Sequence, residues 1–177
     1  MKRMLLLNFI FISCFLFGQN ETTVKTFLEG NGYTYVHELI YGGFKVHLYN
    51  KENRLTHVDL VYKETGEAPP FDLHEKRVED EAWSYDKTMS IINNAFTLDQ
   101  KLSVCEHKLY VAIYVDSTTG KLTEVEFIFR KNTPFSQIPL SVFREIEVKL
   151  KEQVYFTLTE AGRKVNYIYF GWIHEVE

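Results

Sequence analysis

The chain has 177 residues, with 20 basic and 24 acidic side chains and a formal net charge of −4. Apolar residues make up 45% and charged residues 25%, close to the averages of soluble globular proteins, which excludes a disordered, collagen-like or disulfide-rich chain. The acidic balance, without a run of Lys or Arg, argues against nucleic acid as a partner. We therefore expect one folded domain with no nucleic-acid-binding role.

Residues 1–18 have the layout of a secretory signal peptide. Two basic residues precede an apolar run over residues 4–17, and this run is shorter than the roughly 18 residues that a membrane-spanning helix needs. We expect cleavage near Gly18 and a periplasmic or secreted protein. Residues 11–14 loosely resemble a bacterial lipobox, so a lipoprotein anchored to the membrane through Cys14 is the alternative.

Cleavage would leave residues 19–177 as a single α+β domain. Because the leader contains two basic and no acidic side chains, this part of the chain has 18 basic and 24 acidic side chains and a net charge of −6. Cys105 would be its single cysteine, so no internal disulfide can form. We expect Cys105 to lie in a buried strand, as small apolar thiols commonly do.

A repeated segment organises the chain. Residues 54–63 align without a gap with residues 121–130, with three identical positions and six conservative differences. The Phe-Thr-Leu sequence of residues 96–98 recurs at residues 156–158. We interpret this pattern as a duplicated β-hairpin/helix unit, with copies at roughly residues 44–98 and 111–175.

Alternating apolar residues predict an antiparallel hairpin at the start of each copy. In the second copy, a three-residue loop that ends at a left-handed Gly120 pairs Val111 with Phe127 and Ile113 with Val125. In the first copy, Asn53 takes the place of the glycine. The same register there places His47 opposite His57 on the solvent side of the two strands.

A helix is expected after each hairpin. One apolar stripe covers residues 78–96, with a capping box at Asp72 and Glu75, and another covers residues 143–154. Residues 165–176 form a closing strand with apolar side chains on both faces, which favours an interior position, and residues 31–38 predict another strand. The predicted fold is an antiparallel sheet packed against two helices, an α+β architecture.

The second copy resembles the TonB C-terminal domain over roughly residues 109–175. The resemblance rests on a strand, a turn, a second strand, a helix and a comparable pattern of Phe, acidic residue, Gly and Lys before the last strand. In this chain they are Tyr110 to Asp116, Thr119-Gly120-Lys121, the strand to Arg130, the helix through Val154, and Phe156-Thr157-Leu158-Thr159-Glu160-Ala161-Gly162-Arg163-Lys164. It implies a hairpin, helix and strand in this order, and pairing through a sheet edge. TonB energy transduction needs a retained membrane anchor and a long proline-rich linker, so we do not extend that activity to this chain. The whole chain is more similar to an uncharacterised exported bacterial protein.

Two histidines are the candidate metal ligands. His47 and His57, at cross-strand distance, suit Zn²⁺ or Cu²⁺, with Asp59 or Tyr49 as the third ligand that such a site needs. The alternative is that both histidines are solvated on a polar face. The sequence contains no glycine-rich phosphate loop and no Gly-x-Ser-x-Gly motif, so we expect no catalytic residues and no cofactor.

A non-catalytic binding or protein-interaction module of the cell envelope is the function that the sequence favours. Aromatic residues make up 15% of the chain, and four tyrosines predict aromatic surface on or beside the sheet: Tyr110, Tyr114, Tyr167 and Tyr169. These tyrosines are core residues in the alternative interpretation. We expect residues 33–38 to cover one sheet edge and the first hairpin to leave the other open to strand addition by an envelope protein, an extended peptide or a second copy. A small envelope enzyme or metal-binding protein that uses His47 and His57 is the alternative function.

Overall fold

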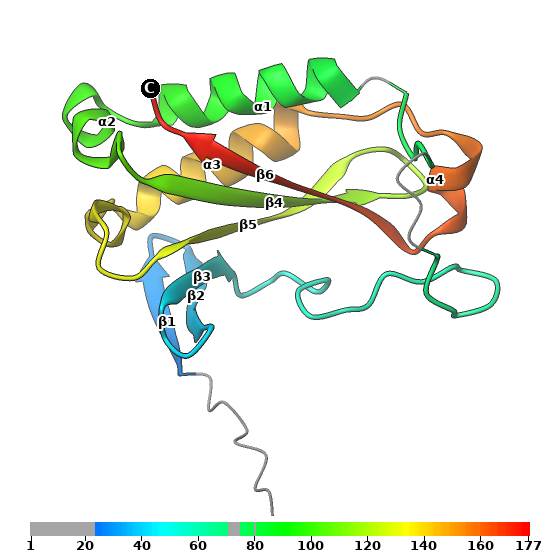
Figure 1. The fold of residues 1–177 in the computed structure, drawn as a ribbon, viewed down its shortest axis with the longest axis horizontal. Coiled ribbons are helices and arrows are strands. Elements are labelled where there is room, and N and C mark those ends of the chain that lie inside the picture. The colour runs from blue at the N-terminus through cyan, green and yellow to red at the C-terminus, as the bar shows by residue number, and fades with distance from the viewer. Residues whose placement is uncertain (1–23, 71–74, 80) are drawn as a thin grey trace, which may run out of the picture.

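The computed structural model describes residues 24–70, 75–79 and 81–177 (Figure 1). Six antiparallel strands form one sheet in the order β1-β2-β3-β5-β4-β6, and the helices α1 and α3 lie together on one face of it. The α+β fold with a sheet covered by helices is therefore confirmed. The strands are β1 (Lys25–Gly30), β2 (Tyr33–Ile40), β3 (Lys45–Asn50), β4 (Lys108–Asp116), β5 (Leu122–Arg130) and β6 (Tyr167–Glu175). The helices are α1 (Glu81–Ala95), α2 (Leu98–Val104), α3 (Leu140–Gln153) and α4 (Glu160–Lys164), with a short 3₁₀ turn, η1 (Pro134–Gln137).

The hairpin of β4 and β5 has the predicted register in its central part, but the pairing shifts next to the turn, where Val115 pairs with Leu122, and the turn is one residue longer than the predicted three-residue loop. Val111 pairs with Phe127 and Ile113 pairs with Val125, and Gly120 has a φ of 74° in the connecting turn. The alternating apolar residues of these strands face α3, where the rings of Phe127 and Phe143 lie 5.1 Å apart. The core between the sheet and α3 is therefore the part of the fold that the apolar periodicity determines.

Helix α1 is rotated relative to the predicted stripe. Tyr85, one of the apolar side chains that form the predicted stripe over residues 78–96, is exposed, whereas Ser84 and Thr88 are fully buried. The ring of Tyr85 instead packs at the edge of the sheet, 5.7 Å from the indole of Trp172. The predicted capping box includes Asp72, which lies outside the described residues.

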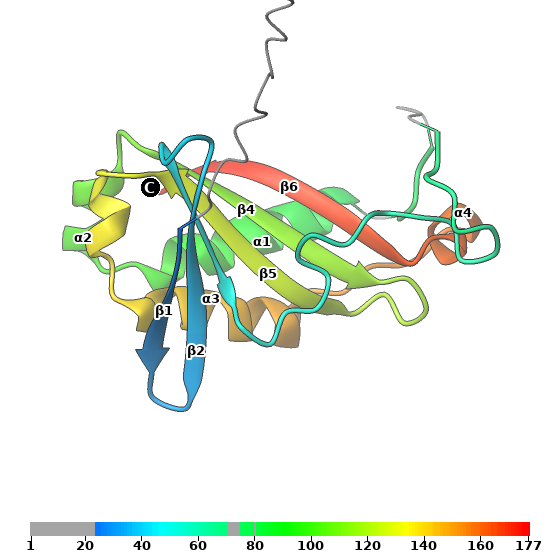
Figure 2. The same cartoon turned by 90° about the horizontal axis from the view of Figure 1, so that it is seen from below.

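The predicted hairpin of the first copy is wrong. Strand β3 pairs with β2 on one edge and with β5 on the other, so no edge remains for residues 54–63. Residues 51–62, here called the strap, instead run across the sheet face opposite the helices as a loop (Figure 2). Asn53 does not have a positive φ, whereas His57 does, at 67°.

The sheet edges also differ from the prediction. The predicted strand at residues 31–38 exists as β2, but β1 pairs with its outer side and forms the edge of the sheet. Strand β6 is the other edge rather than an interior strand, and β3 of the predicted open hairpin is interior. Tyr169 and Ile173 of β6 are consequently exposed.

Cys105 is exposed, contrary to the prediction of a buried strand. The Thr97 capping box starts α2, and the chain turns after Val104 before β4 begins. The helices that the structure describes are all too short or too polar to span a bilayer. The predicted signal peptide and Cys14 lie outside the described residues.

Candidate functional site

The sheet face opposite α1 and α3, here called the open face, is the candidate binding surface. Strand residues alternate between the two faces, so the odd positions of β3, the even positions of β2 and β4, and the even positions of β5 from Glu124 onward point away from the helices. Much of this face is polar yet buried, including Glu38, His47, Glu124 and Glu126. Buried carboxylates are costly without partners, so each of these glutamates is expected to accept hydrogen bonds.

Hydrogen bonds to the sheet hold the strap against the open face. The carboxylate of Glu124 accepts hydrogen bonds from the backbone N–H groups of Arg54 and Leu55, at 2.8 and 2.9 Å. Thr56 Oγ1 donates to Glu126 Oε1 at 2.6 Å. At the far end of the strap, Tyr167 donates its hydroxyl proton to the carbonyl of Val58 (2.5 Å). These contacts place His57 above β2 and β3.

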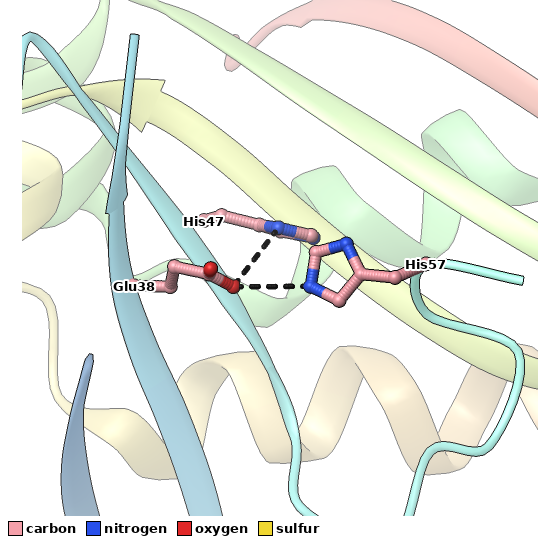
Figure 3. Close-up of side chains that lie close together, drawn as sticks. All are labelled: Glu38, His47 and His57. Carbon is pink, nitrogen blue, oxygen red and sulfur yellow. Dashed lines mark hydrogen bonds and ion pairs between the residues drawn. The ribbon is translucent and has the colours of Figure 1, made fainter. Parts of the chain in front are cut away.

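Glu38, His47 and His57 meet on the open face (Figure 3). Glu38 Oε2 lies 3.2 Å from His57 Nε2 and 4.0 Å from His47 Nδ1. The second ring nitrogen of His47, Nε2, lies 2.9 Å from Glu126 Oε2. His47 and both carboxylates are buried, whereas the side chain of His57 is 55% exposed. We call Glu38, His47, His57 and Glu126 the carboxylate–histidine cluster.

Burial and hydrogen bonding shape the acidity of the groups around the cluster. Burial opposes ionisation of Glu38, but hydrogen bonds from Tyr49 and Lys25 and the charge of Lys25 hold its pKa below the usual range. Burial and the Glu38 carboxylate raise the pKa of Tyr49. Burial and the Glu126 carboxylate likewise raise the pKa of Tyr114. Glu38 is thus ionised at neutral pH beside protonated phenols, and it can act as an acceptor or a ligand.

The two predicted histidines lie close together, although not across a β-hairpin. His47 belongs to β3 and His57 to the strap, and their ring centroids are 5.9 Å apart. Their carboxylate neighbour is Glu38 rather than Asp59, whose backbone carbonyl accepts a hydrogen bond from Asn166. Tyr49, the other predicted third ligand, donates its hydroxyl proton to Glu38 Oε2 at 3.0 Å. His47 is not solvated as the alternative prediction had it.

Sequence reasoning missed Glu38 and Glu126. Gly42 and Gly43 have positive φ values and form the turn between β2 and β3. Pairing the chain about this Gly-Gly turn would have placed Glu38 opposite His47, as it is in the structure. Glu126 reaches His47 through the pairing of β3 with β5, which no local signal indicates.

The four predicted tyrosines divide into two pairs. Tyr114 and Tyr167 are buried beneath the strap side of the open face, with ring centroids 5.3 Å apart. The hydroxyl groups of Tyr110 and Tyr169 form a hydrogen bond of 2.7 Å, and Tyr169 is 42% exposed. The second pair therefore supplies aromatic surface, and the first pair supports the strap.

A groove of about 490 Å³ adjoins the carboxylate–histidine cluster on the open face. Its walls combine tyrosines, apolar side chains and three cations: Tyr41, Lys45, Lys108, Tyr110, Ile128, Phe129, Arg130, Tyr169 and Ile173. Lys45 and Arg130 face each other across β3 and β5, and Lys108 forms an ion pair with Glu175 at 3.2 Å. The groove is thus an amphipathic surface with a local excess of positive charge.

These features define a class of small α+β protein in which one sheet face is covered by helices and the other carries a polar cluster and a groove. The chain belongs to the family described as "Domain of unknown function (DUF5043)", whose model matches residues 19–172. It is similar to a crystal structure of a DUF5043 family protein from Bacteroides uniformis, with 36% sequence identity and a TM-score of 0.80. That match covers 86% of this chain and 91% of the other. A comparison with curated proteins found no match.

Proposed function

We propose that this protein is a non-catalytic binding module of the cell envelope that holds an extended acidic segment of another envelope protein. The groove beside β6 is the observation that carries the proposal. Lys45, Lys108 and Arg130 supply positive charge at its walls, and Tyr169 supplies exposed aromatic surface. Aromatic and arginine side chains are common anchors in protein interfaces.

The adjoining strand edge determines the form of the ligand. Among the described residues, β4 alone pairs with β6, so the outer edge of β6 is free to accept an added strand. Tyr169 and Ile173 lie both on this strand and in the groove. An extended segment paired with β6 would therefore place its acidic side chains near the groove cations. A second copy of the chain, added through the same edge, would give a homodimer instead.

Photocrosslinking tests this proposal in the envelope. A photoreactive phenylalanine analogue at Tyr169 should crosslink to a partner, and Arg130→Glu should abolish that crosslink because the groove loses its positive charge. The same analogue at Trp83, an exposed residue of α1 on the helical side, is the control position. Equal crosslinking from both positions, or a crosslink that survives Arg130→Glu, would contradict the proposal. A crosslink only to itself, with a dimer in sedimentation, would identify the partner as a second copy.

We propose that the protein reaches the envelope through the signal peptide at residues 1–18. The apolar run after two basic residues supports export, and Cys14 supports the lipoprotein alternative. For a periplasmic or secreted protein, mass spectrometry of the intact mature protein should give the mass of a chain that begins near Gln19. A mature protein that retains the leader would refute export, and an added diacylglycerol on Cys14 would identify a lipoprotein.

We also propose that the two halves derive from a duplicated unit like the TonB C-terminal domain. In support, β4, β5, α3 and β6 follow one another in the order that the resemblance implies, and α1 and α3 lie side by side on one sheet face. Under this proposal the strap stands in the place of a strand in the first copy. Relatives whose sequences lack the repeat between residues 54–63 and 121–130 would argue against it.

A further inference from the structure

We propose that Glu38, His47 and His57 bind a borderline divalent transition metal ion, with Zn²⁺ as the representative ion, and that Glu126 positions His47 for this role. The donor set is two imidazoles and one carboxylate, a combination that suits Zn²⁺ and leaves a fourth coordination position for water or a ligand. This inference is independent of the groove, which uses other residues.

The geometry is close to that of a tetrahedral site. Metal–ligand bonds of about 2.0–2.1 Å in a tetrahedron separate the ligand atoms by about 3.3 Å. Glu38 Oε2 and His57 Nε2 are 3.2 Å apart, and Glu38 Oε2 and His47 Nδ1 are 4.0 Å apart. One ligand atom from each of the three residues lies within 4.8 Å of the other two. The separations must shorten by up to about 1.5 Å. His57 can move because it lies half-exposed on the strap, and Glu38 Oε2 needs to approach His47 Nδ1 by about 0.7 Å.

The contact between Glu126 and the other ring nitrogen of His47 favours the ligand role of His47. Its Nε2 bonds to Glu126 Oε2 at 2.9 Å, and since a carboxylate only accepts hydrogen bonds, Nε2 carries the proton. In the neutral ring Nδ1 is then unprotonated and faces Glu38 and His57. A carboxylate on the second nitrogen of a ligating histidine is the usual arrangement in metal sites. Thr56 and Tyr49 hydrogen-bond the two carboxylates in turn.

The charges also favour a bound cation. Glu38 and Glu126 are both about 3% exposed. Among the residues that the structure describes, Lys25 is the one lysine or arginine in an ion pair with either of them, at 3.3 Å from Glu38. A divalent ion would balance the remaining negative charge at a buried position, where counter-charge is worth most.

The backbone of His57 lies in the left-handed region. A φ of 67° is uncommon outside glycine and costs conformational energy, and here it occurs at the residue whose ring turns toward Glu38. A metal bound by His57 would join the strap to β2 and β3. Metal binding should therefore protect the strap from proteases.

Equilibrium dialysis of the purified protein against ZnCl₂, with metal analysis, is the primary test. We expect one Zn²⁺ per chain, and at least about tenfold weaker binding in His57→Ala and His47→Ala. His37→Ala is the matched control, because His37 precedes Glu38 but lies on the other face of β2. Because His57 lies on an exposed loop, its loss leaves the core intact. If His47→Ala unfolds, His57→Ala therefore still tests the proposal.

Two further readouts separate ligation from a structural role. Co²⁺ in place of Zn²⁺ should give the strong visible absorption of four-coordinate cobalt, and Glu126→Gln should weaken binding about 10- to 100-fold without unfolding the protein. Zn²⁺ should slow cleavage within residues 51–62 in the wild type but not in His57→Ala. Absence of Zn²⁺ binding by the wild type, or binding that survives His57→Ala unchanged, would overturn the proposal, and wild-type affinity in Glu126→Gln would overturn the positioning role of Glu126.

Discussion

Replacement of Glu147 by alanine should be among the most destabilising single changes in this protein. The side chain projects from α3 into the core and is fully buried. It accepts hydrogen bonds from Arg144 at 2.8 Å, from Lys151 at 2.6 Å and from Asn50 at 3.2 Å, and also from the hydroxyl of Tyr35. The carboxylate thus joins α3 to β2 through Tyr35 and to β3 through Asn50, and its two cationic partners lie on α3 itself.

The expected loss follows from those partners. Alanine would leave Tyr35 and Asn50 buried without their acceptor and would leave Arg144 and Lys151 without their counter-charge. A buried polar group without its partner costs about 1–3 kcal/mol, so the loss of the acceptor shared by Tyr35 and Asn50 should cost about 2–6 kcal/mol, a large share of the roughly 5–15 kcal/mol that stabilises a domain. Urea unfolding followed by circular dichroism would measure the loss in free energy of unfolding.

A matched variant on the same helix provides the control. Glu145→Ala removes a half-exposed ion pair with Lys149 and should cost at most about 1 kcal/mol. Tyr35→Phe should cost about 1.5–3 kcal/mol alone, but much less in the Glu147→Ala background, where its acceptor is already gone. Equal costs for Glu147→Ala and Glu145→Ala, or full additivity with Tyr35→Phe, would refute this account of the core.

Three other predictions concern pH, a turn and the strap. Burial lowers the pKa of His174, so the unfolded chain takes up a proton before the folded chain as the pH falls below about 6.5, and the free energy of unfolding should decrease there. Urea titrations from pH 5 to 7 should show this decrease, and His174→Asn should make it smaller. Gly120→Ala combines a φ of 74° with a Cβ that would lie 2.0 Å from the backbone oxygen of Phe156, so it should lower the free energy of unfolding by about 1–3 kcal/mol. Gly43→Ala should cost much less, because nothing lies within 4 Å of its Cβ position, and similar costs for the two variants would contradict the steric explanation. Glu124→Gln weakens two hydrogen bonds from strap N–H groups, so it should speed proteolysis within residues 51–62 while the free energy of unfolding stays nearly unchanged. An unchanged proteolysis rate would show that contacts other than those of Glu124 hold the strap.

The sequence predicts local pairing well and distant pairing poorly. The central pairs of the β4–β5 hairpin, Val111 with Phe127 and Ile113 with Val125, could be predicted because they depend on a nearby turn and on side-chain alternation. The irregularity at Tyr114 and Val115, next to the turn, could not. The same alternation in residues 54–63 indicates which side chains share a face, but not that β5 already occupies the neighbouring edge of β3. A strand pattern without a free edge to pair with becomes a loop, and here it becomes the strap.

For the same reason, the carboxylate–histidine cluster could be predicted from the sequence only in part. His47 and His57 could be recognised by residue type, whereas Glu126 lies 79 residues from His47 and meets it through a non-local strand pair. Periodicity places Glu126 on a polar face, which normally means solvent. Its burial depends on the strap that covers the face, and no pattern within either segment predicts that cover.

The two buried clusters of acidic side chains differ in a way that bears on function. Glu147 is one carboxylate with two cationic partners, so it is satisfied within the chain and stabilises the fold. Glu38 and Glu126 are two carboxylates with Lys25 as their described lysine or arginine partner, and a strained backbone at His57 lies beside them. Apolar residues at these positions would stabilise a covered sheet face better than buried, under-neutralised charges do. Buried charge with little counter-charge and a left-handed backbone at one place are typical of a binding site, and a divalent cation supplies the charge that this place lacks.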